Sequence, residues 1–143
     1  MRHGKHTFKI GRTSSHRRCL IANMLKSLIE HERIVTSVAK AKELKRHADR
    51  IITLAKKNTL ASKRQVIGQL MITHTAASKD ARLAKKKAAG DKAEPEARHT
   101  LITKLFGPLS ARFAERNGGY TRVIKGADRV GDNSPTCILE FIS

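Results

Sequence analysis

The chain has 143 residues, the length of one ordinary domain, and its hydrophobic fraction of 39% without any Trp allows only a modest, mainly aliphatic core. Thirty Lys and Arg against twelve Asp and Glu give a formal net charge of +18, so the partner should be a polyanion. A membrane is excluded as that partner, because the sequence contains neither a long apolar span nor a basic amphipathic helix with aromatic anchors.

Residues 1–13 are predicted to form a basic N-terminal arm. Residues 1–18 carry six Lys and Arg, three His and no acid. Such a stretch buries too little apolar surface to order itself, so we expect the arm to become ordered when phosphates neutralise it. It has no apolar run or small-residue cleavage site, and it therefore does not resemble a secretory signal. An α+β domain is expected over residues 14–143.

The next segments alternate between helical and extended patterns. Apolar residues recur at helical spacing from Ser15 to about Glu30, which predicts a core-facing helix. The β-branched run at residues 33–38 predicts a short strand. A second helix is predicted from Ala39 to Lys57, with an apolar seam on one side and basic residues on another. Asn58 should end it in a left-handed conformation, and a third, shorter helix is predicted from Leu60 to Met71.

The second half of the chain begins with a compositional change. Residues 75–98 are rich in Ala and Lys with mixed charges, which predicts an exposed, partly helical insertion. Helical spacing returns from Thr100 to Arg116, where Gly107-Pro108 should bend or restart the helix. A Gly-rich break then precedes two predicted strands, residues 120–125 and 136–142, joined by a long loop. The order of elements predicts an α+β fold, a single compact domain with helices packed on a small mixed sheet.

Basic residues cluster with one sign in the first part of the chain, and this pattern indicates nucleic-acid binding. Residues 1–58 contain fifteen Lys and Arg against four Asp and Glu. A solvated surface is the alternative for isolated lysines, but counterion release makes every phosphate contact of such a cluster favourable. RNA is favoured over DNA because no recognition helix, zinc finger or basic zipper is evident. The candidate RNA-binding residues are Arg2, His3, Lys5, Lys9, Arg12, Ser14, Ser15, His16, Arg17, Arg18, Lys40, Lys42, Lys45, Arg46, Lys56, Lys57, Arg112, Arg116, Tyr120, Arg122, Lys125 and Arg129.

Other chemistry is poorly supported by the residue pattern. Tyr120 is the one candidate for stacking a base, although packing in the core is the more common role of a lone Tyr. No paired acids, oriented His, phosphate-binding loop or metal-ligand spacing stands out, so we expect no catalysis, no metal, no cofactor and no small-molecule substrate. Cys19 and Cys137 lie far apart in the sequence and are expected to be reduced thiols.

Two other function classes remain open at this point. An RNA-modifying or RNA-cleaving enzyme would need a constellation of acids, bases or metal ligands that the sequence does not show. A free nucleoid protein or RNA chaperone could be equally basic, so composition alone does not distinguish it from a protein with a fixed position in a ribonucleoprotein.

Two separated blocks carry a resemblance to a known family. The first runs from Met1-Arg2-His3 to Ile52-Thr53-Leu54-Ala55-Lys56, and the second from Lys104-Leu105-Phe106 to Ile138-Leu139-Glu140. The chain resembles the bacterial large ribosomal subunit protein seventeen family over about the first 70 and the last 40 residues, outside the insertion. The resemblance implies a noncatalytic constituent of the large subunit that binds 23S ribosomal RNA in the cytoplasm, with other ribosomal proteins as neighbours.

Overall fold

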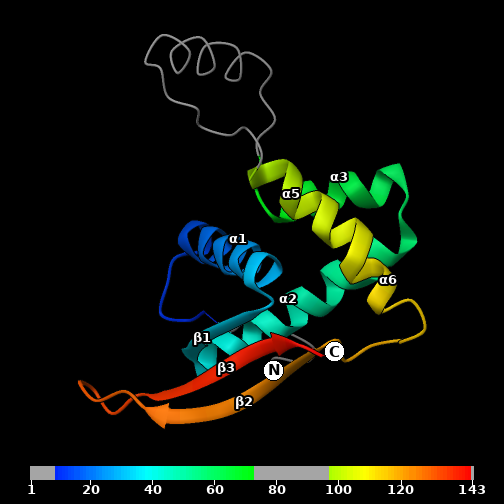
Figure 1. Ribbon diagram of the computed structural model, residues 1–143. Helices are drawn as coiled ribbons and strands as arrows, with labels where there is room; N and C mark the ends of the chain where they lie inside the picture. Colours follow the sequence, from blue (N-terminus) through cyan, green and yellow to red (C-terminus); the bar gives the residue numbers. More distant parts are fainter. Residues whose placement is uncertain (1–8, 73–96, 143) are drawn as a thin grey trace, which may run out of the picture.

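The computed structural model describes residues 9–72 and 97–142 and shows helices packed on a small sheet (Figure 1). The predicted insertion and the first eight residues of the arm lie outside these ranges, except that residues 97 and 98 begin a helix. In chain order, the elements are α1 (Ser14–His31), β1 (Arg33–Ser37), α2 (Val38–Lys57), α3 (Leu60–Gln69), α5 (Ala97–Lys104), the π-helical turn η1 (Leu105–Leu109), α6 (Ser110–Arg112), β2 (Thr121–Asp128) and β3 (Pro135–Phe141).

The α+β class predicted from the sequence is confirmed, with one change in the sheet. The strand order is β1-β3-β2, and both pairings are antiparallel, so the sheet is not mixed. Leu139 on the central strand pairs with Ile34 on one side and Val123 on the other. The hairpin between β2 and β3 makes this pair antiparallel. The direction of β1 depends on how α1 and α2 pack, and the local sequence pattern does not predict that packing.

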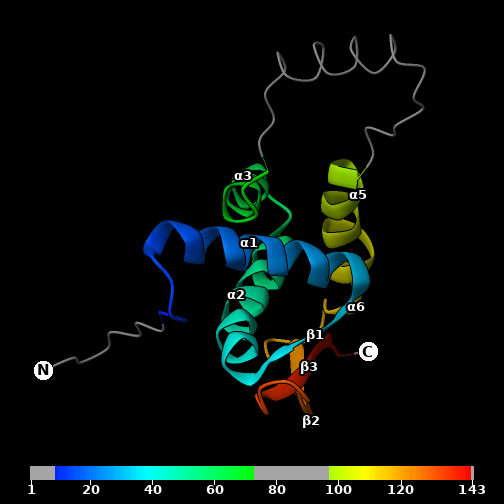
Figure 2. The ribbon, with the colours of Figure 1, turned by 90° about the vertical axis from the view of Figure 1, so that its left-hand side faces the viewer.

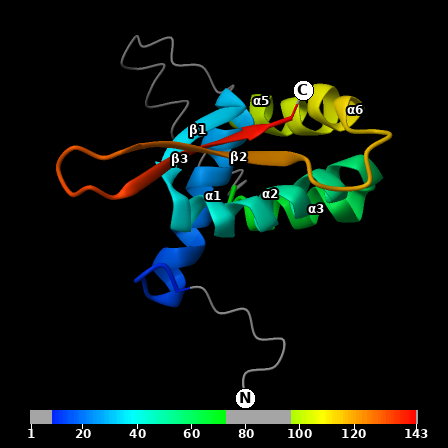
Figure 3. The ribbon, with the colours of Figure 1, turned by 90° about the horizontal axis from the view of Figure 1, so that it is seen from below.

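The helices cover one face of the sheet. In Figures 1 and 3, α2 runs along this face, and in Figure 2 α1 crosses α2. On β3, the alternate residues Cys137, Leu139 and Phe141 are buried beneath the helices, as the two-residue period of a strand predicts. On the opposite face, Val35 and Ile124 remain exposed.

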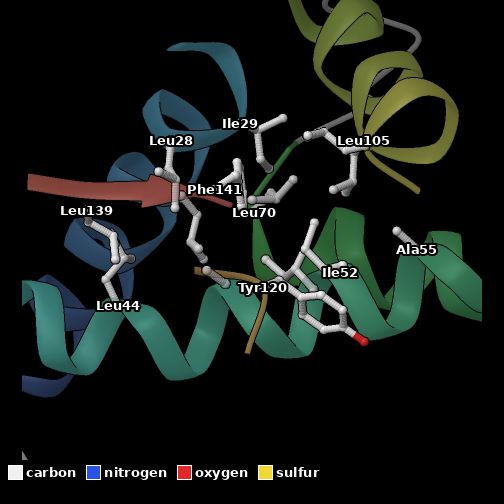
Figure 4. Packing of buried hydrophobic residues seen from close by; sticks show 14 of the residues in the cluster. Leu28, Ile29, Leu44, Ile52, Ala55, Leu70, Leu105, Tyr120, Leu139 and Phe141 are labelled. Carbon is white, nitrogen blue, oxygen red and sulfur yellow. The ribbon is translucent and has the colours of Figure 1, made fainter. Parts of the chain in front are cut away.

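The core is organised by a seam of small and branched residues along α2. Ala41, Ala48 and Ala55 recur every seven residues with Leu44 and Ile51 between them, and all five are buried; Figure 4 labels Leu44 and Ala55. Small side chains let neighbouring segments approach the helix backbone closely. The hydroxyl of Ser110, for example, donates a hydrogen bond to the carbonyl of Ala55 at 3.4 Å. The seam therefore explains how several elements pack around one helix.

The predicted helix ends are largely confirmed, and Pro108 is accommodated without a restart. Asn58 ends α2 with a positive φ of 46°, as expected. At Pro108, which has no N–H to donate, the helix widens into the π-helical turn η1 and continues into α6. Leu105 and Leu109, at the two ends of this turn, are both buried. Both leucines therefore remain in the core across the π-helical turn.

Glu32 joins three parts of the fold at the end of α1. Its backbone has φ 60°, and its N–H donates to the carbonyl of Leu28, which ends the helix. Its carbonyl accepts the N–H of Phe141 at 3.0 Å, which attaches the end of β3. Its carboxylate lies 2.9 Å from the Lys104 ammonium and 2.8 Å from the Arg112 guanidinium. The hydrogen bond from Lys104 and that from Arg112 lower the pKa of this carboxyl.

We expect Glu32→Gln to lower the free energy of unfolding by about 1 kcal/mol at neutral pH, because both ion pairs are lost. The native pKa of Glu32 lies below its ordinary value of 4.5, so its stabilising effect is complete above that value and declines as the pH falls through the native pKa. Urea unfolding of both proteins at several pH values measures this. The difference between them should shrink with acidification, and a constant difference would contradict the assignment.

Candidate nucleic-acid interface

The face of α2 opposite the alanine seam carries an exposed row of cations. We call Lys42, Arg46, Arg50 and Lys57 the α2 basic row, since their spacing places them along one stripe about 22 Å long. All four are exposed. Within residues 9–72 and 97–142, Lys42, Arg50 and Lys57 have no acidic partner, and Arg46 lies 3.8 Å from Glu43. The row is thus a strip of largely uncompensated positive charge.

The start of α1 provides a second basic surface. Ser14, Ser15, His16 and Arg18 are exposed and Arg17 is half-buried, and the helix start projects beyond α2 (Figures 2 and 3). The first turn contains no acid, and the N-cap residue makes no side-chain hydrogen bond to it. The N–H groups at this helix end therefore retain the capacity to bind an anion.

The described end of the arm folds back in a tight turn just before α1. Ile10 and Gly11 both have positive φ, and the N–H of Arg12 donates to the carbonyl of Lys9 at 3.0 Å. Lys9 and Arg12 are exposed. The remaining arm candidates, Arg2, His3 and Lys5, lie outside the described residues.

A cleft of about 560 Å³ between α1, α2 and α3 brings the two basic surfaces together. Arg18 of α1 and Arg50 of α2 both line it. Arg50 is not among the candidates that the sequence suggested, although it follows Arg46 by four residues, the spacing of one helical face. Extending the basic row by one turn would have found it.

Tyr120 is a core residue in this structure. Its side chain is 2% exposed, and its ring centroid lies 5.2 Å from that of Phe113 (Figure 4 shows Tyr120). The Lys56 ammonium lies 5.6 Å from the centre of the same ring and donates to the carbonyl of Arg116 at 2.6 Å. The ring is thus committed to packing, the alternative anticipated from the sequence, and no face remains on which a base could stack.

Several candidate cations are held by partners within the chain. The Arg122 guanidinium lies 2.8 Å from the Glu140 carboxylate on the neighbouring strand, and Arg33 approaches the same carboxylate from the other side at 3.5 Å. These residues face one another across the three strands in register. Similar intramolecular partners occupy other candidates: Arg112 with Glu32, Arg116 with the carbonyl of Gly118, and Arg129 with Asp132.

The remaining candidates lie at the margins of these surfaces. Lys40 and Lys45 on α2 are half-buried, whereas Lys125 on the β2–β3 hairpin is exposed. Figures 1 and 3 show that this hairpin extends beyond the helices. The candidates predicted from the sequence therefore do not form one continuous patch, and the densest group of unpaired cations lies on α1 and α2.

The described residues offer no competing catalytic or metal centre. Cys19 is exposed and Cys137 is buried, and neither is in a disulfide in this structure. Burial raises the pKa of the Cys137 thiol. Across residues 9–72 and 97–142, no group of three or more His, Cys, Asp or Glu is arranged to hold a metal ion. Within the same part of the chain, none of the helices has the length and apolar content to span a bilayer.

Comparisons with known proteins agree closely on one family. The family model described as ribosomal protein L17 matches residues 20–142. The large ribosomal subunit protein bL17 of Chlamydia trachomatis serovar L2 is 55% identical over 144 residues and covers 100% of both chains. The proteins of the same description from Chlamydia muridarum and Chlamydia pneumoniae are 54% and 53% identical, covering 100% of this chain and 99% of each relative.

These matches correct the extent of the resemblance stated from the sequence. The motifs left residues 75–98 outside it, but both the family match and the full-length relatives run through that segment. Its Ala- and Lys-rich composition offers few distinctive residues, which is why motif comparison failed there. The segment is thus spanned by the match to the Chlamydia relatives, whose full length this chain covers.

The division between held and unpaired cations predicts different effects on stability. Arg112→Gln should lower the free energy of unfolding by about 1 kcal/mol, because Glu32 loses a partner. Arg50→Gln should change it by no more than about 0.5 kcal/mol, because the side chain is exposed and has no acidic partner in the described part of the chain. Urea unfolding of the two variants distinguishes the cases. A larger loss for Arg50→Gln would show that the α2 basic row has a structural role.

Proposed function

The chain belongs to the ribosomal protein L17 family, and we propose that it acts in the large ribosomal subunit by binding and stabilising large-subunit (23S) ribosomal RNA. Proteins of this family are structural components of the ribosome and not enzymes. The proposal places the protein in the cytoplasm within the ribosome, with other large-subunit proteins as neighbours. It includes no cofactor, membrane or small-molecule substrate.

The observation that carries the RNA-binding part is the α2 basic row. A helix in a free-standing domain would have little reason to keep four exposed cations on one stripe with so little compensating acid, since their mutual repulsion opposes folding. RNA phosphates remove this repulsion and release counterions. The basic start of α1 extends the same surface toward residues 1–13, which we propose act as an RNA-binding arm.

The candidate residues divide into two groups in this proposal. The cations without acidic partners in the described chain should contribute most to RNA binding, because they lose no internal contact on meeting a phosphate. The cations held within the chain should contribute less, since an RNA contact competes with an existing one. The first group comprises Lys9, Arg12, Arg17, Arg18, Lys40, Lys42, Lys45, Lys57 and Lys125, to which the structure adds Arg50. The second comprises Lys56, Arg112, Arg116, Arg122 and Arg129, and Arg46 lies between the groups because its guanidinium is 3.8 Å from Glu43.

Membership of the large subunit is tested by sedimentation. A tagged form of the full chain should travel with large subunits through a gradient at high salt. A free nucleoid protein or RNA chaperone would instead dissociate and remain near the top of the gradient. Such dissociation would contradict the proposal that the protein has a fixed position in the large subunit.

The basic row is tested by the salt dependence of RNA binding. Lys42→Gln combined with Arg46→Gln should weaken binding to a large-subunit RNA transcript and reduce the slope of log affinity against log salt by roughly 0.7–0.9 for each cation removed. The control combines Arg33→Gln with Arg64→Gln, which removes the same charge from β1 and α3. Equal effects of the two double variants would mean that only net charge matters, and the row would have no special role.

The arm is tested by deletion of residues 1–12. The repeated apolar positions that form the core lie after this segment, so cooperative melting and the far-UV circular dichroism signal should be preserved. RNA affinity and its salt slope should both fall, since Arg2, Lys5, Lys9 and Arg12 are removed. A truncated protein that fails to fold, or that binds RNA as tightly as the full chain, would contradict the proposed role of the arm.

A further inference from the structure

The cleft between α1, α2 and α3 has a composition that the general attraction for phosphate does not explain. Its lining includes the apolar side chains of Ile21, Leu25 and Met71. Ile21 is half-buried, Leu25 is buried, and Met71 is 42% exposed. A surface that bound only phosphates would require cations, whereas the lining of this cleft combines cations with apolar side chains.

The rim of the cleft is polar and carries no negative charge. Arg18 and Arg50 approach it from α1 and α2, and Gln65 and Gln69 approach it from α3. None of the described lining residues is acidic. Amide side chains both donate and accept hydrogen bonds, so they suit the mixed edges of a nucleobase, and the arginines suit the phosphates beside it.

Gly68 leaves one wall of this cleft without a side chain. It lies within α3, where glycine lowers helix stability compared with alanine, and a Cβ built at this position meets no atom within 4 Å. The glycine is thus not required by a close contact among the described residues. Its absent side chain does keep the space beside Gln65 and Gln69 open.

On these grounds we propose that the cleft receives the unpaired base of one RNA nucleotide. The base lies against Ile21 and Met71, its edge meets Gln65 and Gln69, and the flanking phosphates lie near Arg18 and Arg50. The volume of about 560 Å³ is in the range of sites for small ligands, and a single nucleotide is of that class. Specific recognition of RNA commonly uses such unstacked bases, whose edges are free for hydrogen bonding.

Two features favour a nucleotide over a peptide segment as the occupant. The two arginines come from different helices, α1 and α2, and match the phosphates that flank a base, while a peptide would need acidic side chains to meet them. Arg50 also belongs to the α2 basic row, so an RNA strand that follows the row arrives at the cleft without changing direction. This inference rests on the proposed RNA-binding function and adds a specific site to it.

The test compares two substitutions at the same position. Gly68→Leu fills the cleft and keeps every charge, whereas Gly68→Ala adds one methyl group to open space and favours the helix. Thermal melting should show that both variants fold, with Gly68→Ala no less stable than the original protein. A second cleft variant, Gln65→Ala with Gln69→Ala, removes the proposed edge contacts without adding bulk.

The probe is the large-subunit RNA transcript, measured by affinity and by chemical footprinting. We expect Gly68→Leu and the double Gln variant to weaken binding by about tenfold, a size typical of losing one base contact, and to leave the salt slope unchanged. Gly68→Ala should bind within about twofold of the original protein. The original protein should protect an unpaired base from dimethyl sulfate, and Gly68→Leu should lose this protection while the backbone protection from hydroxyl radicals remains.

Three outcomes would overturn the site. The base protection could persist in Gly68→Leu, or the affinity of both cleft variants could stay unchanged. Alternatively, Gly68→Leu could bind the transcript normally but fail to enter large subunits, which would assign the cleft to a protein neighbour. These outcomes differ from a failure of the proposed RNA-binding function. In that case the original protein would show neither salt-dependent affinity for the transcript nor protection of its backbone from hydroxyl radicals.

Discussion

The carboxylate of Glu32, held between Lys104 and Arg112, joins helices from the two halves of the chain at the edge of the core. It attaches the end of α1 to α5 and α6, segments from the other half of the chain. The Lys104 ammonium also donates to the carbonyl of Glu30 at 2.9 Å, so a cation lies at the negative end of the α1 dipole. The backbone of Glu32 adds the link to β3. One residue therefore combines a helix end, a sheet contact and two ion pairs.

Other acidic residues also contact more than one cation. The chain has a net charge of +18 and few acidic residues, so some of these acids are shared between basic side chains. Glu140 serves two arginines across the sheet, and Glu43 lies near Arg46 and His47. Glu32 and Glu140 thus connect different elements, whereas Glu43 pairs within α2, and all three relieve repulsion inside the fold. The α2 basic row and the start of α1 receive little of this compensation. A polyanion such as RNA supplies what the chain itself lacks.

Helix α2 connects the fold to the proposed function, since one face packs in the core and the opposite face carries the α2 basic row. The alanine seam allows α1, the sheet and the turn η1 to pack closely, and that packing fixes the direction in which the opposite face points. The cleft arises from the same crossing of α1 over α2 (Figure 2). The surfaces proposed to face RNA are therefore positioned by core packing, which is the condition for reading a particular RNA shape.

The sequence by itself determined the class of fold, most element bounds, the family and the sign of the surface, because helical periodicity, β-branched runs and charge counts are local properties. It anticipated that Cys137, Leu139 and Phe141 share one buried face, and that the basic residues of α2 lie off the apolar seam. Only the tertiary structure decided which cations are free. Arg112 and Arg122 look like RNA contacts in the sequence, yet their acidic partners lie 80 and 18 residues away. The sequence also did not predict the cleft, because Arg18, Arg50 and Gly68 come together only when three helices pack. Local sequence patterns carry no information about such long-range proximity.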